Sequence, residues 1–244
     1  MQLNLTFTAK RPLALPLGHH AALQGFIYSL LRQSPEYSEF LHDIGYGDSP
    51  HAFKLFVFST LRGKHVISDS KIIFTDKMYL DIRSPKQEFC RTIFSALFSK
   101  EEFELDHQPI RLENCVSSNK QISSGSIDIQ MLSPLTLSTT YMEGDRKKTR
   151  FISPIDDDFA DALNHNLRSK YEASFQKATN ESVELVPLDF GKTKKYITKF
   201  NNHIYINAWN GKYRLSGSPE ILSFLYDAGL GSRNSQGFGM FEEI

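Results

Sequence analysis

The sequence has few cysteines, no excess of charge and no long apolar run. Cys90 and Cys115 are the only two cysteines among 244 residues, and neither belongs to a C-x-x-C pair. We therefore expect reduced structural thiols rather than a disulfide framework. Basic and acidic residues both number 28, so no net charge draws the whole chain toward nucleic acid or a membrane. Only local clusters of charge can serve such a purpose.

No stretch of 18 apolar residues is present, and the first residues alternate apolar and polar side chains instead of forming a signal-peptide core. We expect a cytoplasmic protein without membrane contact. The motifs H-E-x-x-H, G-x-S-x-G and the P-loop are also missing. None of the eight histidines lies in a recognised metal motif, so we expect neither a catalytic metal nor a cofactor.

The first half of the chain alternates between strand and helix patterns. Period-two alternation predicts a strand over residues 3–7, and an apolar stripe at helical spacing predicts a helix over 19–33. Further patterns predict strands at 53–59, 72–82 and 103–115, with a helix over 85–99 before the last of them. The order strand, helix, strand, strand, helix, strand is that of a ferredoxin-like unit.

A similar order follows in the second half. Strand patterns cover 127–132 and 135–140, interrupted at Pro134, and later 184–188, 204–209, 213–215 and 238–241. Helix patterns cover 156–178 and 218–228, the second with a Ser218-Pro219 start. We therefore predict an α+β protein of tandem ferredoxin-like (RRM-like) domains, residues 1–122 and 123–244.

A glycine-rich stretch joins the last predicted helix to the last predicted strand. Gly229, Gly231, Gly237 and Gly239 flank a polar insert that contains Arg233 and Asn234. Backbone amides in such a stretch can approach an anion or a nucleic-acid backbone closely. Alternatively the stretch is only a turn, with Gly229 as a helix cap. A dinucleotide site is disfavoured, because its glycine fingerprint follows a strand and opens a helix.

Basic residues cluster twice in the second half. Residues 146–150 contain four basic side chains, and residues 191–214 contain six basic and no acidic ones, interleaved with Tyr196, Tyr205, Trp209 and Tyr213. This composition fits a surface that pairs phosphates and stacks bases, but also a solvated strand–loop–strand with core aromatics. The candidate RNA-binding residues here are Arg146, Lys147, Lys148, Lys192, Lys194 and Lys195.

A histidine, a lysine and a tyrosine are sufficient to cleave RNA without a metal, because the reaction requires only proton transfers and stabilisation of a phosphorane. His42, Lys54 and Tyr28 offer such a set within the first predicted domain. Taken singly, each has an ordinary alternative: a loop histidine, a lysine at the start of a strand and a tyrosine beside a helix.

Several segments together carry a family resemblance. They are the terminal glycine pattern, the segment LPLGHHAALQGFIYSLL at 15–31, FLHD at 40–43, FKLFVFS at 53–59, MLSPL at 131–135 and Ala208-Trp209. Across nearly the whole chain they closely resemble the CRISPR-associated endoribonuclease that processes repeat transcripts into guide RNAs. This family belongs to the repeat-associated mysterious protein superfamily.

The resemblance implies tandem ferredoxin-like domains and metal-independent cleavage within the CRISPR repeat, leaving a 2′,3′-cyclic phosphate and a 5′-hydroxyl. It implies that His42 is the general acid or base, that Tyr28 orients or deprotonates the 2′-hydroxyl and that Lys54 stabilises the phosphorane. His20 and His51 are alternative catalytic histidines. The glycine stretch would contact the RNA backbone.

Repeat RNA is therefore the expected partner, together with CRISPR effector-complex subunits or a second copy of the chain. The alternative function is that of a non-catalytic RNA-binding subunit of an effector complex. A protein of the same fold without any role in RNA is the third possibility.

Overall fold

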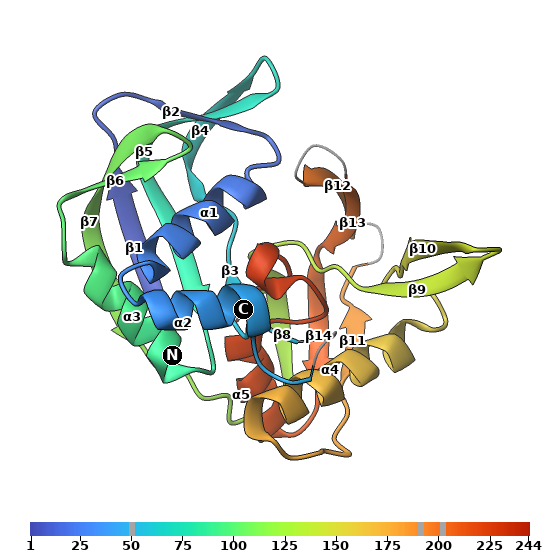
Figure 1. Ribbon diagram of the computed structural model, residues 1–244. Helices are drawn as coiled ribbons and strands as arrows, with labels where there is room; N and C mark the ends of the chain where they lie inside the picture. Colours follow the sequence, from blue (N-terminus) through green and yellow to red (C-terminus); the bar gives the residue numbers. More distant parts are fainter. Residues whose placement is uncertain (49–51, 190–192, 201–203) are drawn as a thin grey trace.

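A computed structural model describes residues 1–48, 52–189, 193–200 and 204–244. Strands of one antiparallel sheet come from residues 2–118, and strands of a second come from residues 126–243 (Figure 1). Each sheet has helices against it, and the two halves pack against each other. No helix in the described part of the chain is long and apolar enough to cross a membrane.

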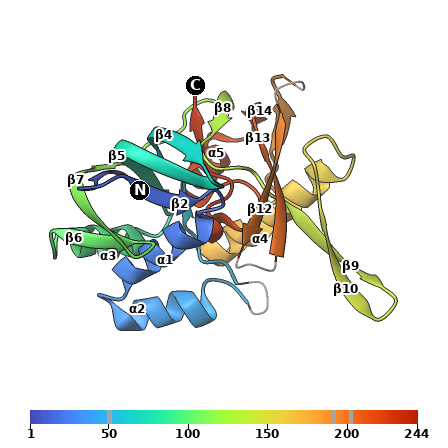
Figure 2. The same cartoon turned by 90° about the horizontal axis from the view of Figure 1, so that it is seen from above.

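The first half contains a ferredoxin-like core. Its strands and helices are β1 (Gln2–Thr8), β2 (Leu13–Pro16), α1 (His20–Leu31), α2 (Pro35–Glu39), the π-helix η1 (Phe40–Ile44), β3 (Val57–Phe58), β4 (Arg62–Ser68), β5 (Lys71–Arg83), α3 (Gln87–Leu97), β6 (Glu102–Leu105) and β7 (Gln108–Ser118). The strand order β7-β1-β5-β3 is that of the ferredoxin-like unit. Helices α1 and α3 lie on the same face of this sheet (Figure 2).

The second half repeats the arrangement with two insertions. Its elements are β8 (Ser126–Met131), β9 (Ser138–Glu143), β10 (Arg146–Phe151), α4 (Phe159–Phe175), β11 (Glu184–Pro187), β12 (Lys194–Phe200), β13 (Ile204–Asn210), β14 (Lys212–Ser216), α5 (Pro219–Ala228), the 3₁₀ turn η3 (Asn234–Gln236) and β15 (Phe241–Glu243). The sheet order is β11-β14-β8-β15, and β9–β10 and β12–β13 form separate two-stranded ribbons. Mixed α/β structure with antiparallel sheets thus confirms the expected fold class.

Apolar spacing explains the helices that position the site. Helix α1 buries Leu23, Phe26, Ile27 and Leu30 against the first sheet, as its 3.6-residue stripe predicts. Helix α5 begins at Pro219, and the Ser218 hydroxyl accepts a hydrogen bond from the Ile221 amide at 3.4 Å. Both helices therefore start and pack close to where their sequence signals place them.

Several local predictions are wrong. Strand β2, helix α2, the π-helix η1 and strand β4 had no counterpart among the predicted elements. The strand predicted over 53–59 is reduced to β3 at Val57 and Phe58 and an isolated bridge between Phe53 and Tyr46, because Leu55 takes a positive φ of 51° that interrupts extended backbone. The last strand covers 241–243 rather than 238–241.

The predicted interrupted strand around Pro134 is two elements in different sheets. Residues 126–131 form β8 of the second sheet, whereas Ser138–Glu143 pairs with β10 in an exposed ribbon that projects from the molecule (Figures 1 and 2). Because both faces of this ribbon are largely solvated, the sequence has no buried-face alternation to mark it.

Polar contacts join the two halves. The buried Arg83 guanidinium of β5 donates from Nε to Gln2 Oε1 at 3.0 Å, donates from Nη1 to the Phe241 carbonyl, and lies 3.6 Å from the centre of the Tyr226 ring. Thr60 donates from both its amide and its hydroxyl to the Leu132 carbonyl, at 3.1 and 3.0 Å. These contacts fix the first sheet against α5, β8 and β15.

Candidate active site

Tyr28, His42 and Lys54 lie together although they come from three segments. Tyr28 is half-buried on α1, and its ring meets the His42 ring edge-on, 6.1 Å between centroids. His42 belongs to the π-helix η1, and Lys54 lies on the segment that leads into β3. Lys54 Nζ donates a hydrogen bond to the His42 carbonyl at 2.8 Å. The structure thus brings together the three residues that the sequence singles out.

A cavity of about 550 Å³ opens beside Tyr28 and His42. Its lining comes from α1 and from the α2–η1 segment, and it includes Gln24, Arg32, Ser38, Glu39 and Asp43. The size is within the range of small-ligand or single-nucleotide pockets. Both aromatic side chains can therefore reach a group bound from solvent.

Hydrogen bonding orients the His42 imidazole. Its Nδ1 lies 2.6 Å from Asp43 Oδ1, and the two side chains are 75% and 69% exposed. If Nδ1 carries the hydrogen that bonds to this carboxylate, Nε2 is left with a lone pair in the neutral ring. Such a ring can take up a proton at Nε2 and return it.

Burial sets the protonation of the two neighbours. It raises the pKa of Tyr28 to about 12, so the phenol keeps its proton near neutral pH. Burial also lowers the pKa of Lys54, while the nearby Asp43 carboxylate works in the opposite direction. Tyr28 is therefore suited to donating a hydrogen bond rather than to removing a proton.

The alternative histidines occupy other surroundings. His20 is 2% exposed, stacks on Phe238 at 4.7 Å between ring centroids, and has a pKa lowered to about 3 by burial. An imidazole enclosed in this way cannot exchange protons with a substrate in solvent, so the geometry favours His42. His51 lies outside the described residues.

The glycine stretch is mostly interior. Gly229, Gly231, Gly237 and Gly239 are buried and have φ between 65° and 86°, which favours glycine. The amides of Gly229, Gly237 and Gly239 donate to the carbonyls of Leu225, Asn234 and Pro134. A Cβ at Gly239 would overlap the Leu230 carbonyl. The glycines thus shape the loop, and these three amides are engaged within the protein rather than free for an anion.

Asn234, expected as an RNA contact, also has an internal role. It is 8% exposed, and its Nδ2 donates to the carbonyls of Leu230 and Phe238, both at 2.9 Å. Its Oδ1 accepts from Lys170 Nζ at 2.7 Å. The part-exposed side chains of the loop are Ser232, Arg233, Ser235 and Gln236, of which Arg233 binds Gln236 at 3.1 Å.

The predicted basic residues lie on the two ribbons. Arg146, Lys147 and Lys148 are exposed on β10, where Lys148 pairs with Glu143, and Lys194 and Lys195 are exposed on β12. Lys192 lies outside the described residues. Arg150 is paired with Asp158 and stands 4.0 Å from Asp156. Among the described residues of these ribbons, Arg146, Lys147 and the lysines of β12 form no ion pair.

Sequence reasoning missed several residues of this region. Lys170, on α4, is 1% exposed and bonds to the glycine stretch, and Gln24 donates to the Ser235 carbonyl at 2.8 Å. A signal for Lys170 existed: it shares the buried stripe of α4 with Leu163, Leu167 and Tyr171. A lysine on an apolar stripe is unusual and indicates a specific internal partner.

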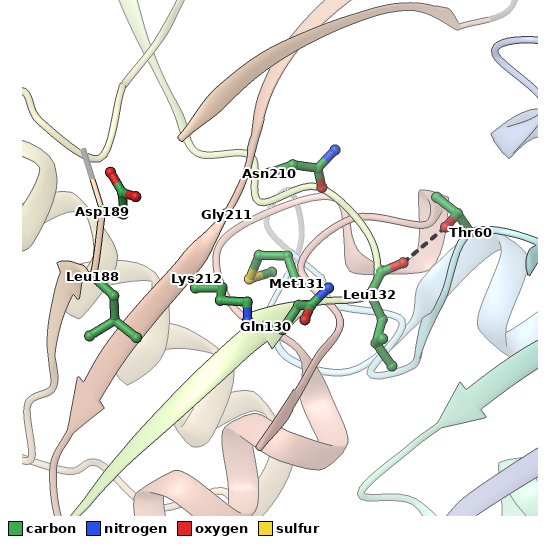
Figure 3. Close-up of a pocket in the computed structure, with 9 residues that line it drawn as sticks. All are labelled: Thr60, Gln130, Met131, Leu132, Leu188, Asp189, Asn210, Gly211 and Lys212. Atoms are coloured by element: carbon green, nitrogen blue, oxygen red, sulfur yellow. Dashed lines mark hydrogen bonds between the residues drawn. The ribbon is translucent and has the colours of Figure 1, made fainter. Parts of the chain in front are cut away.

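A second cavity, of about 530 Å³, lies where the two halves meet (Figure 3). It is lined by Thr60 of the first half and by side chains of β8, β14 and neighbouring segments, including Gln130, Asn210 and Lys212. Tyr28 and His42 do not line it. The described residues contain no group of three or more His, Cys, Asp or Glu side chains that could hold a metal ion.

Two ferredoxin-like units in tandem, with a glycine-rich loop before the final strand, define the structural class of this chain. Sequence comparison identifies the family. Residues 14–115 match "CRISPR-associated protein Cas6, N-terminal", and residues 117–243 match "CRISPR associated protein Cas6, C-terminal". The chain belongs to the Cas6 family.

Individual relatives agree with this assignment. The chain is 27% identical to "CRISPR-associated endoribonuclease Cas6 1" of Methanocaldococcus jannaschii, covering 100% of this chain and 93% of the relative. It is 23% identical to "CRISPR-associated endoribonuclease Cas6" of Pyrococcus furiosus, covering 94% and 84%.

Solved structures show the same fold. A "CRISPR associated protein Cas6" superimposes with a TM-score of 0.82 at 24% identity, covering 100% and 99% of the two chains. A structure described as "An RAMP protein binding different RNA substrates" gives 0.84 at 23% identity, with the same coverage.

Proposed function

We propose that this protein is an endoribonuclease that cleaves precursor CRISPR RNA within the repeat to produce guide RNAs. The observation that carries the proposal is that Tyr28 and His42 meet beside an open cavity and that Lys54 is hydrogen-bonded to the His42 carbonyl. Relatives that match across most of this chain are named CRISPR-associated endoribonucleases, which supports the substrate class.

The proposed reaction is an internal transfer that needs no metal. The 2′-oxygen of one nucleotide attacks the adjacent phosphorus while its hydroxyl proton passes to a base. The bond from phosphorus to the 5′-oxygen breaks, and this oxygen takes up a proton. The products carry a 2′,3′-cyclic phosphate and a 5′-hydroxyl, and no water is consumed.

His42 is the general acid or base in this proposal. Its Nδ1 contact with Asp43 leaves Nε2 directed to other partners, and the exposed ring can reach RNA from solvent. In the neutral ring Nε2 accepts the 2′-hydroxyl proton, and in the protonated ring it donates to the 5′-oxygen. In either case the contact with Asp43 holds the ring in this orientation.

Tyr28 and Lys54 provide hydrogen bonding and charge. With a pKa raised to about 12, Tyr28 donates its phenol hydrogen to orient the 2′-hydroxyl or a phosphate oxygen. Lys54 uses one N–H donor on the His42 carbonyl, and its remaining donors can face the oxygens of the phosphorane. The same hydrogen bond sets the position of His42 relative to the lysine.

The domain assignment follows from this placement. We propose that residues 1–122 form the domain that cuts and residues 123–244 the domain that holds RNA. Strands of the first sheet end at Ser118, and those of the second begin at Ser126. RNA contacts are proposed for the basic ribbon residues and Arg233, with Gly229, Gly231, Asn234, Gly237 and Gly239 shaping the loop. Binding to effector-complex subunits, or to a second copy, stays a prediction.

Incubation of purified protein with end-labelled repeat RNA in EDTA tests the proposal. We expect one cut within the repeat and a product that carries a cyclic phosphate. Absence of cleavage, or cleavage only after a divalent metal is added, contradicts it. Tight RNA binding without cleavage, unaffected by His42→Ala, would instead identify the non-catalytic RNA-binding subunit. No RNA binding even at low salt would exclude both, because phosphate contacts strengthen as salt falls.

A further inference from the structure

Lys170 is a lysine buried in the second half without an acidic partner among its hydrogen bonds. It is 1% exposed and lies on the face of α4 that packs into the core. Its Nζ donates to the carbonyls of Gly229 and Gly231 at 2.8 Å each and to Asn234 Oδ1 at 2.7 Å. The three donors of an ammonium group are therefore all used, and all on the glycine stretch.

A buried charge is unfavourable unless polar groups are held around it. Burial lowers the pKa of Lys170 to about 7, and no charged group contributes to that shift. The glycine stretch supplies these polar groups. The carbonyls of Gly229 and Gly231 both accept hydrogen bonds from Nζ, and these two glycines have positive φ values of 83° and 65°. The conformation of the loop and the burial of the ammonium group thus depend on each other.

Asn234 extends this contact through the loop. While its Oδ1 accepts from Lys170, its Nδ2 donates to Leu230 on one side and Phe238 on the other. The two arms of the loop are therefore tied to one amide, which is tied to one ammonium group. Arg233 and Ser235, the neighbours of Asn234 in sequence, are held by the same anchor.

The loop in turn contacts the candidate active site. The Ser235 carbonyl accepts a hydrogen bond from Gln24 Nε2 at 2.8 Å. Gln24 precedes Tyr28 by one helical turn on α1, and both line the cavity beside His42. On the other side, Lys54, Arg233 and Ser235 line a cavity of about 370 Å³ that Lys170 also reaches.

We infer that Lys170 is a positioning residue for RNA cleavage. Its ammonium group holds the loop 229–239 so that Arg233 and Ser235 stand beside Lys54, and so that the Ser235–Gln24 hydrogen bond fixes the part of α1 that carries Tyr28. The inference rests on the proposed function. Lys170 itself does not touch the RNA.

The first test replaces Lys170 by methionine, which has a similar length but no charge and no donor. We expect the single-turnover rate of repeat-RNA cleavage at saturating protein to fall about 10- to 100-fold, the cost of misplacing a site by about an ångström. Circular dichroism and the melting temperature establish that the variant is folded at the assay temperature. A folded variant that cleaves at the wild-type rate overturns the inference.

The second test distinguishes positioning from general destabilisation by a double-mutant cycle with Gln24→Met, which removes the donor to Ser235. If both residues act through the loop, the rate effect of Gln24→Met becomes much smaller in the Lys170→Met background. If the rate of the double variant is instead reduced by the product of the two single reductions, the residues act independently and the inference is contradicted. Gln24→Lys, which keeps a donor for the Ser235 carbonyl, is expected to retain more activity than Gln24→Met.

If Lys170→Met does not fold, the Gln24 variants test the inference on their own. Equal rates for Gln24→Met and wild type then overturn the inference, because the link from loop to helix has no effect. Wild-type cleavage in the same assay separates the two hypotheses. An inactive wild-type protein refutes the proposed function and this inference with it, whereas an active wild type with unaffected variants refutes only the inference.

Discussion

His42 and His20 lie in opposite environments, and this difference directs the catalytic assignment. The His42 imidazole is exposed and bonded to Asp43, whereas His20 is enclosed by Phe238 and Tyr196. Both belong to segments that carry the family resemblance. Exposure is a property of the folded chain, so the sequence left the choice between them open.

Replacement of His42 by alanine should lower the rate of repeat-RNA cleavage by about 10²- to 10⁴-fold, the usual contribution of a general acid or base. RNA affinity should change little, because the imidazole is one of many contacts. Cleavage and filter-binding assays on the same preparations measure the two quantities. His107→Ala is a matched control, since His107 is 95% exposed on the turn between β6 and β7. An unchanged rate for His42→Ala would move the assignment to another histidine.

Burial of His20 predicts a pH-dependent stability. The unfolded chain takes up a proton at His20 below a pH of about 6.5, but with a folded pKa of about 3 the native protein does not. Stability from neutral His20 is therefore complete above pH 6.5 and is lost as the pH falls toward 3. Urea unfolding measures this loss. Between pH 6.5 and 3, the free energy of unfolding of the wild type should fall by up to about 1.4 kcal/mol more per pH unit than that of His20→Gln.

The difference between the two proteins isolates His20, because other titrating groups contribute to both. Equal slopes for His20→Gln and wild type would show that His20 titrates normally in the folded protein.

Among the elements, the glycine loop is a connection that packing constrains strongly. Gly239 has a φ of 82° and would place a Cβ against the Leu230 carbonyl, whereas Gly144, at the β9–β10 turn, has a φ of 58° and open space around it. Both positions favour glycine, but only the first is also crowded. Alanine at Gly144 therefore measures backbone strain alone, and alanine at Gly239 measures strain and steric overlap together.

Gly239→Ala should lower the free energy of unfolding by at least about 3 kcal/mol, since strain and overlap add. Gly144→Ala should cost only about 1 to 2 kcal/mol, the price of a left-handed residue with a side chain. Urea or thermal unfolding of both variants measures the difference. Similar costs at the two positions would mean that the loop relaxes around the added methyl group.

The ribbon β9–β10 is the other element with an expected role. Lys147 is exposed, and its ribbon projects away from both sheets (Figure 2). Lys147→Ala should weaken repeat-RNA binding and reduce the slope of log affinity against log salt by about one, as loss of one phosphate contact predicts. Arg91→Ala, on the exposed side of α3, should leave the slope unchanged. Identical slopes for all three proteins would remove the ribbon from the RNA interface.

Helices with an apolar stripe were predictable, and elements with at most one buried residue were not. Helices α1, α3 and α5 have apolar stripes that could be seen in the sequence. The π-helix η1 has one buried residue, Leu41, and the ribbon β9–β10 has none, so periodicity gave no signal for either.

The candidate site was also predictable only in part. Tyr28, His42 and Lys54 were predicted by resemblance, but their contact depends on η1 and on the segment before β3, which no local pattern specifies. Lys170 and Asn234 were missed as a pair because they are 64 residues apart and meet only after the second half folds. The sequence shows which residues have suitable chemistry, and the fold decides which of them face solvent.

In the whole molecule, the two halves are joined by contacts of the glycine loop and of Arg83. The loop is anchored by Lys170 of the second half and contacts Gln24 of the first, while Arg83 connects β5 to Phe241 and Tyr226. The proposed cutting residues lie in one half and the proposed holding residues in the other. On this proposal, the RNA spans both halves when it is cut.

In the proposed reaction, the 2′-hydroxyl beside His42 and Tyr28 is the nucleophile. The most direct measurement uses repeat RNA with a single 2′-deoxynucleotide immediately 5′ of the cut bond, in EDTA, with unmodified RNA in parallel. The modified RNA should bind with unchanged affinity and should not be cleaved, because no cyclic phosphate can form. Cleavage of the modified RNA at the same bond and at a similar rate would contradict the proposed reaction.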